Sequence, residues 1–212
     1  CLRLDGLPLA IELAAAYIKL LSPQAMLTQL DSLWLEMKRP LRNIPARQQT
    51  LRNTIEWSYR FLDEEERRFF AQLAVFRGGC SWEAINTICV NPSSGASTAA
   101  LFEPLNGLVN KSLVWRRTDG NGEPRFGMLE TIREYALSCL QERGEVETLR
   151  QSHAHYYAHY STRISAEIMR INQRQVRNEL SSEWDNLRAA LRWAVEVDPE
   201  PGYRILCMIG DL

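Results

Sequence analysis

Histidines gather in the segment HAHYYAH, which contains His153, His155 and His159. His155 and His159 are four positions apart, so they share one face of a helix, and this spacing can hold a divalent metal ion. The segment lacks the glutamate of an H-E-x-x-H motif, and the sequence offers no evident third ligand. We therefore expect a helix face packed with aromatic side chains here, and no metal site.

Covalent catalysis has still less support in the sequence. It contains no G-x-S-x-G motif, and none of its five cysteines forms a recognisable pair with a histidine. The cysteines are odd in number and include no C-x-x-C pair, which is typical of a protein kept in a reducing compartment. We expect no catalytic residue, no enzyme activity of this segment, and a cytoplasmic location.

A Gly-Leu-Pro turn stands directly before the first helical pattern, and it is the second candidate for chemistry. Gly6 lets the entering backbone turn freely, and Pro8 in the first turn of a helix loses no hydrogen bond. Apolar residues then recur three and four apart as far as Leu21, so one helix face is buried. The residues alone allow two interpretations, a well-made helix start or a turn that faces a ligand.

The elements that position these residues are mostly helices. Helical patterns fill the chain up to residue 110, apart from an exposed connection expected at residues 37–49, and Asp119-Gly120-Asn121-Gly122 then predicts a β-hairpin. One more helix ends at Gly144, and two long amphipathic helices follow. Helices, then a hairpin, then a helix is the order of a winged helix. We expect a mainly α fold with three parts: a helical subdomain (1–48), a winged helix with one β-hairpin (49–144) and the start of a TPR-like helical repeat region (145–212).

Composition limits the partners. The net charge is −1, without the basic excess of a dedicated nucleic-acid binder, and no apolar run is long enough to cross a membrane. The wing carries Arg116, Arg117 and Arg125, which would meet phosphates if the domain bound DNA. The helix before the wing is mostly apolar and carries Glu103, which favours protein docking. We therefore do not expect DNA binding by this segment, and we expect no membrane partner.

Five segments carry a resemblance to a known family. They are LDGLPLAIELAAA, RQQTLRNTIEWSYRFLDEEERRFFAQLAVFRGGCSWEA, LVNKSLV, RFGMLETIREYA and EWDNLRAALRWA, in this order over nearly the whole chain. Together they resemble the NB-ARC-related signal-transduction ATPases of the STAND class, found in bacterial LuxR-type and SARP-type transcriptional regulators. The chain begins without Met and ends in an apolar run, so we expect a segment of a longer protein.

The resemblance implies a nucleotide-adjacent role for three residues. In this family the Gly-x-Pro motif, here Gly6 and Pro8, lies beside the adenine. Many members carry Met-His-Asp where this chain has Met128, Leu129 and Glu130, and a leucine cannot replace a phosphate-binding histidine. Arg133, one turn further on, could replace it, or it is a solvated charge on the helix face.

The resemblance also implies a function and its cofactor. The G-x-x-x-x-G-K-[ST] motif is missing, so ATP or ADP would bind only in the full-length protein, itself an ATPase, and this segment alone would take no cofactor. The segment would be the regulatory part of an ATP/ADP switch, in which the winged helix gates the nucleotide module. Its partners would be an upstream P-loop domain, downstream helical repeats, and a protein or small-molecule effector. Two alternatives stay open, a DNA-binding winged-helix regulator and a protein-interaction scaffold that does not switch.

Overall fold

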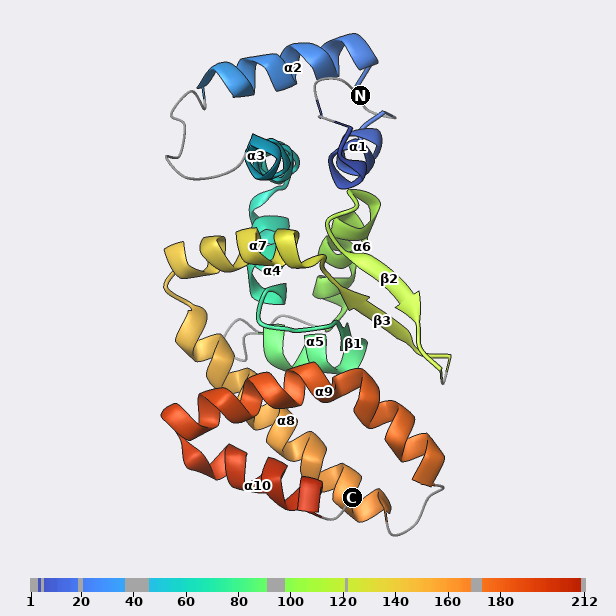
Figure 1. Ribbon diagram of the computed structural model, residues 1–212, viewed down its shortest axis with the longest axis vertical. Helices are drawn as coiled ribbons and strands as arrows, with labels where there is room; N and C mark the ends of the chain where they lie inside the picture. Colours follow the sequence, from blue (N-terminus) through green and yellow to red (C-terminus); the bar gives the residue numbers. More distant parts are fainter. Residues whose placement is uncertain are drawn as a thin grey trace.

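The computed structural model describes residues 4, 6–18, 21–36, 46–90, 98–120, 122–168 and 173–210. Most of the connection expected at residues 37–49 lies outside these ranges. The winged helix occupies the middle of the molecule, with α1–α3 at one end and α8–α10 at the other (Figure 1). In chain order the elements are α1 Pro8–Ala15, α2 Pro23–Glu36, α3 Ala46–Arg60, α4 Glu64–Leu73, β1 Cys80–Ser81, α5 Trp82–Cys89, the 3-10 helix η3 Thr98–Leu101, α6 Phe102–Asn110, β2 Trp115–Thr118, β3 Pro124–Gly127, α7 Glu130–Glu142, α8 Val146–Ile168, α9 Gln173–Glu196 and α10 Pro199–Gly210.

The amino-terminal helices pack on α3 through aromatic side chains. Pro8 starts α1 after an extended residue, as the sequence predicts, and the helix buries its apolar face. Tyr17 meets Trp57 edge-on with 4.8 Å between ring centroids, a favoured aromatic geometry. Its hydroxyl donates a hydrogen bond of 3.0 Å to the Ser58 carbonyl oxygen. One buried phenol thus attaches the first part of the chain to the end of α3.

Local capping signals fix where the winged helix elements begin. The Asp63 side chain accepts a hydrogen bond from the Glu66 backbone N–H, and the Glu66 side chain accepts one from the Asp63 N–H. This capping box, which the sequence predicts, starts α4. Ser81 caps α5 in the same way by accepting from the Ala84 N–H.

The mainly helical fold with a winged helix is confirmed, and it contains one more strand than the predicted hairpin. Within the described residues the sheet has three strands in the order β1-β3-β2, because Cys80 and Ser81 pair antiparallel with β3. A two-residue strand is too short to show an alternating pattern, so the sequence could not reveal it. The resulting order α4-β1-α5-α6-β2-β3 places α5 and α6 before the wing.

Two glycines, Gly79 and Gly127, leave room for the Trp115 ring. A Cβ atom on Gly79, whose φ is +99°, would lie 2.5 Å from the Trp115 ring. A Cβ on Gly127 would overlap the same ring and would lie 2.9 Å from the Gly79 Cα. Both positions therefore need glycine, Gly79 for its backbone conformation as well as for space.

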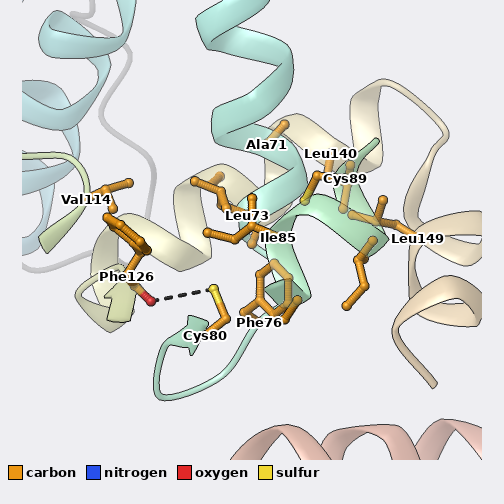
Figure 2. Close-up of a cluster of buried hydrophobic side chains, with 14 of the residues drawn as sticks. Ala71, Leu73, Phe76, Cys80, Ile85, Cys89, Val114, Phe126, Leu140 and Leu149 are labelled. Carbon is orange, nitrogen blue, oxygen red and sulfur yellow. Dashed lines mark hydrogen bonds between the residues drawn. The ribbon is translucent and has the colours of Figure 1, made fainter. Parts of the chain in front are cut away.

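The hydrophobic core continues from the winged helix into α8–α10. Ile85, Leu108 and Ile132 of the winged helix belong to the same cluster of buried side chains as Ile164 of α8 and Met208 of α10. Figure 2 shows part of this cluster, in which the Cys80 thiol approaches the Phe126 carbonyl oxygen at 3.6 Å. The expected boundaries at residues 48 and 144 stay predictions, and the second one divides a continuous core.

Candidate nucleic-acid interface

The helix before the wing, α6, presents a polar face to solvent. Asn106 and Asn110 are exposed, one turn apart, while Leu105 and Leu108 are buried in the core behind them. Asparagine side chains can both donate to and accept from an adenine base. The exposed side of α6 also carries Glu103 and the largely exposed Phe102, so it combines amides with one carboxylate and one aromatic ring.

The wing presents two arginines. Arg116 and Arg117 are exposed on β2, and the Arg117 guanidinium lies over the Trp115 ring, 4.8 Å from its centroid. This cation–π contact limits the positions that the Arg117 side chain adopts. The hairpin turn is closed by Asp119, whose backbone N–H and side-chain oxygen each form a 2.9 Å hydrogen bond with the backbone of Glu123.

The third predicted phosphate-contacting residue, Arg125, lies away from this open surface. Its side chain is 11% exposed, and it forms an ion pair of 2.5 Å with Glu183 on α9. Its other nitrogen donates to the carbonyl oxygens of Ser182, at 2.8 Å, and Gly79, at 3.3 Å. Burial alone would lower the pKa of Arg125, but the hydrogen bond and the charge of Glu183 outweigh it and raise the pKa. Arg125 therefore joins β3 to α9.

Glu183 and Asn186 are the centre of a buried hydrogen-bond network that the sequence analysis missed. The Glu183 carboxylate also accepts from the Tyr157 hydroxyl, at 2.7 Å, and from the Asn186 side-chain amide, at 2.9 Å. Asn186 donates to the Gly79 carbonyl oxygen at 2.7 Å and accepts from the Arg77 N–H at 2.7 Å. This network, from Arg125 to Arg77, fixes the loop before β1 against α8 and α9. Figure 1 shows where these helices lie relative to β1.

A sequence signal for this network was present. The buried stripe of α9 runs through Leu180, Leu187, Ala190 and Ala194, and Glu183 occupies a position of that stripe. A charged residue on an apolar face is costly to bury unless it is paired, so its place predicts a partner. The sequence spacing does not identify this partner as Arg125, which is 58 positions away.

Arg133 is buried, so its interpretation as a solvated charge is wrong. Its side chain is 7% exposed and forms a forked pair with the Glu130 carboxylate, with distances of 2.9 and 2.6 Å. It also donates to the Ala74 carbonyl oxygen at 3.1 Å, which joins α7 to the end of α4. Gly6 and Pro8 are exposed at the start of α1, and Gly6 has a φ of +64°.

The histidines do not come together as ligands. His153 is buried, His155 is half-buried and His159 is exposed. Burial lowers the pKa of His153 to about 4, against the hydrogen bond to Asn186, and the charge of Arg77 lowers it further. Throughout the described ranges, no group of three or more His, Cys, Asp or Glu side chains is arranged to hold a metal ion. In the same part of the chain, no helix is both long and apolar enough to cross a membrane.

Comparison with known proteins agrees with the winged helix. Residues 62–141 match the model of a winged helix-turn-helix domain. A Mycobacterium tuberculosis protein named as an HTH-type transcriptional regulator is 37% identical over 196 residues, which are 92% of this chain and 22% of that protein. A Mycobacterium bovis protein with the same description gives the same values. An uncharacterized protein of M. tuberculosis is 35% identical over 151 residues, 70% of this chain and 37% of that protein. No solved structure gives a significant match.

The chain therefore contains a winged helix-turn-helix domain and is homologous to proteins named as HTH-type transcriptional regulators. It spans 22% of the length of those regulators. These relatives support the expectation that the segment is not an enzyme. An NB-ARC or STAND ATPase is not shown by these matches, and that part of the resemblance stays a prediction.

The prediction against DNA binding by this segment is wrong. It rested on the net charge and on the apolar character of α6. The match to a winged helix-turn-helix domain and the HTH-type regulator relatives point instead to DNA binding. The structure explains the wrong prediction in part, because Leu105 and Leu108 of α6 face the core and leave Asn106 and Asn110 in solvent beside the exposed Phe102.

Proposed function

We propose that this chain is the DNA-contacting part of a transcriptional regulator and that its winged helix touches the duplex. One observation carries the proposal: α6 and the wing both present polar groups to solvent, Asn106 and Asn110 on the helix and Arg116 and Arg117 on β2. In this role α6 enters the major groove and its amides read base edges. The two arginines contact backbone phosphates beside the groove and set the position of the domain.

Two ion pairs determine which cations of α6 and the wing remain available to contact DNA. Lys111, at the end of α6, forms an ion pair with Glu66 and is half-buried, so it is already neutralised. Arg125 is neutralised by Glu183. Arg116 and Arg117 are thus the wing cations that stay open to an anion. The proposed role requires the compartment that holds the chromosome, which in a bacterium is the cytoplasm.

The proposal is tested by fluorescence anisotropy of a labelled mixed-sequence duplex, titrated with the chain at several salt concentrations. The R116A/R117A double variant removes two phosphate contacts, so the slope of log affinity against log salt should become shallower by about 2. The R188A/R192A variant is the matched control, because it removes the same charge from exposed positions on α9, away from the wing. An equal loss of affinity in both variants, or no binding by the wild type at low salt, would refute the proposed contact.

The nucleotide switch implied by the family resemblance is a separate proposal. The relatives and the matched domain favour a DNA-binding regulator over a gate for an ATP/ADP module. ATP or ADP in the full-length protein, contacted near Pro8, would be sought by nucleotide analysis of the purified full-length protein. The effector role of a TPR-like repeat region stays a prediction, and the structure offers one candidate ligand site.

A further inference from the structure

A cleft of about 500 Å³ lies between the winged helix and the long helices α8 and α9. Its walls come from the loop after α4, from α7, from α8 and from α9. Leu137, Leu140 and Trp193 belong to its apolar lining, and charged side chains also line it. A concave site of this volume, partly apolar and with convergent polar groups, has the size and character of a small-molecule site.

Arginines dominate the charge of this cleft. Of the described residues that line it, five are arginines and three are carboxylates: Arg77, Arg133, Arg150, Arg188 and Arg192 against Glu130, Asp185 and Glu196. The buried imidazole of His153 is neutral at pH 7, since its pKa is about 4. The cleft therefore carries an excess of positive charge although the whole chain has a net charge of −1.

The arginines differ in how far they are already paired. Arg133 is fully engaged by Glu130 and the Ala74 carbonyl oxygen. Arg77 lies 3.8 Å from Glu130, and Arg150 lies 3.2 Å from Glu147.

Arg188 and Arg192 are one turn apart on α9, and within the described residues neither forms a hydrogen bond or an ion pair. Two unneutralised guanidinium groups thus line the same cleft.

We propose that this cleft binds a small phosphorylated molecule and that Arg188 and Arg192 hold its phosphate groups. A guanidinium presents paired N–H donors that match two phosphate oxygens, and two such groups one helical turn apart can hold neighbouring phosphates. The apolar lining around Trp193 receives the uncharged part of the ligand. This inference does not rest on the proposed DNA contact, because it concerns other residues on another element.

The shape of the site favours a small molecule over the phosphates of a nucleic acid. Duplex DNA needs an outward surface such as α6 and the wing, whereas Trp193, which lines the cleft, is 9% exposed. Because the walls belong to both the winged helix and the α8–α9 pair, a ligand here stabilises their packing against each other.

The test is isothermal titration calorimetry of the chain with inorganic pyrophosphate at low salt, with R188A/R192A and R116A/R117A as charge-matched variants. We expect saturable binding to the wild type, a dissociation constant raised by at least about tenfold in R188A/R192A, and no comparable change in R116A/R117A. No saturable binding, or an equal weakening in both variants, would overturn the proposal.

The same variants separate a small phosphorylated ligand from a nucleic-acid backbone. In the anisotropy assay R188A/R192A should bind duplex DNA as the wild type does, and saturating pyrophosphate should not compete with DNA. A loss of DNA affinity in R188A/R192A would assign the cleft to the nucleic-acid surface and would contradict the proposal, while the wing contact would still be judged by R116A/R117A.

Discussion

Replacing Glu183 with glutamine tests whether the buried network joins β3 to the long helices. The carboxylate accepts hydrogen bonds from Arg125, Tyr157 and Asn186, and its side chain is 6% exposed. Glutamine keeps the shape, but it removes the charge opposite Arg125 and turns an N–H group toward groups that donate. Removing one partner of a buried ion pair costs about 3–5 kcal/mol. Because glutamine retains one acceptor, we expect a loss near the lower end, about 3 kcal/mol in the free energy of unfolding.

Urea unfolding followed by circular dichroism measures this loss. The matched control is E200Q, the same substitution at a surface ion pair with Arg204, where Glu200 is 56% exposed and the expected loss is below about 1 kcal/mol. In the double variant R125M/E183Q no buried charge is left without a partner, so part of the stability should return. If E183Q lost no more stability than E200Q, or if R125M/E183Q were less stable than E183Q by the full cost of R125M, the reasoning would be refuted.

Two further substitutions test other parts of the fold. The pKa of His153 falls from 6.5 to about 4 on folding, so the unfolded state takes up the proton first. The contribution of neutral His153 to the free energy of unfolding is fully present above pH 6.5. It is lost as the pH drops toward 4, by about 2 kcal/mol between pH 7 and pH 5. This decrease should be smaller in H153Q when unfolding is measured at both pH values, and equal decreases would contradict it. G127A places a Cβ against the Trp115 ring and should cost about 1–3 kcal/mol, whereas G120A, with no atom within 4 Å of its Cβ, should unfold as the wild type does; a loss shared by both glycines would show that the ring contact is not the cause.

The features of the fold that the sequence predicts depend on residues only a few positions apart. The capping box of Asp63 and Glu66 and the helix start at Pro8 were predicted and are present. The hairpin around Asp119 and Gly122 was predicted from its turn residues, and β2 and β3 flank it. Each of these signals depends on side chains and backbone groups three or four positions apart, which the sequence places together whatever the rest of the chain does.

The unpredicted part depends on contacts between distant positions. Arg125 has the same appearance in the sequence as Arg116 and Arg117, yet its partner Glu183 is 58 positions away and removes it from the open surface. The same holds for strand β1, which exists because β3 is beside it. The polar character of the exposed side of α6 was missed for a related reason. The number of apolar residues in a helix does not show which of its side chains are buried and which are exposed.

Helix α9 contributes side chains to both the buried network next to the wing and the cleft, from different faces of the helix. Glu183 and Asn186 point to the wing-side network, and Arg188 and Arg192, on the following turns, line the cleft. A ligand that draws Arg188 and Arg192 inward acts on a helix whose other face is bonded through Arg125 to β3, the strand beside Arg116 and Arg117. The Glu183–Arg125 ion pair holds α9 and β3 together, so one helix positions both the cleft and the wing. The two sites nevertheless use different residues, so R188A/R192A should weaken pyrophosphate binding alone and R116A/R117A should weaken DNA binding alone.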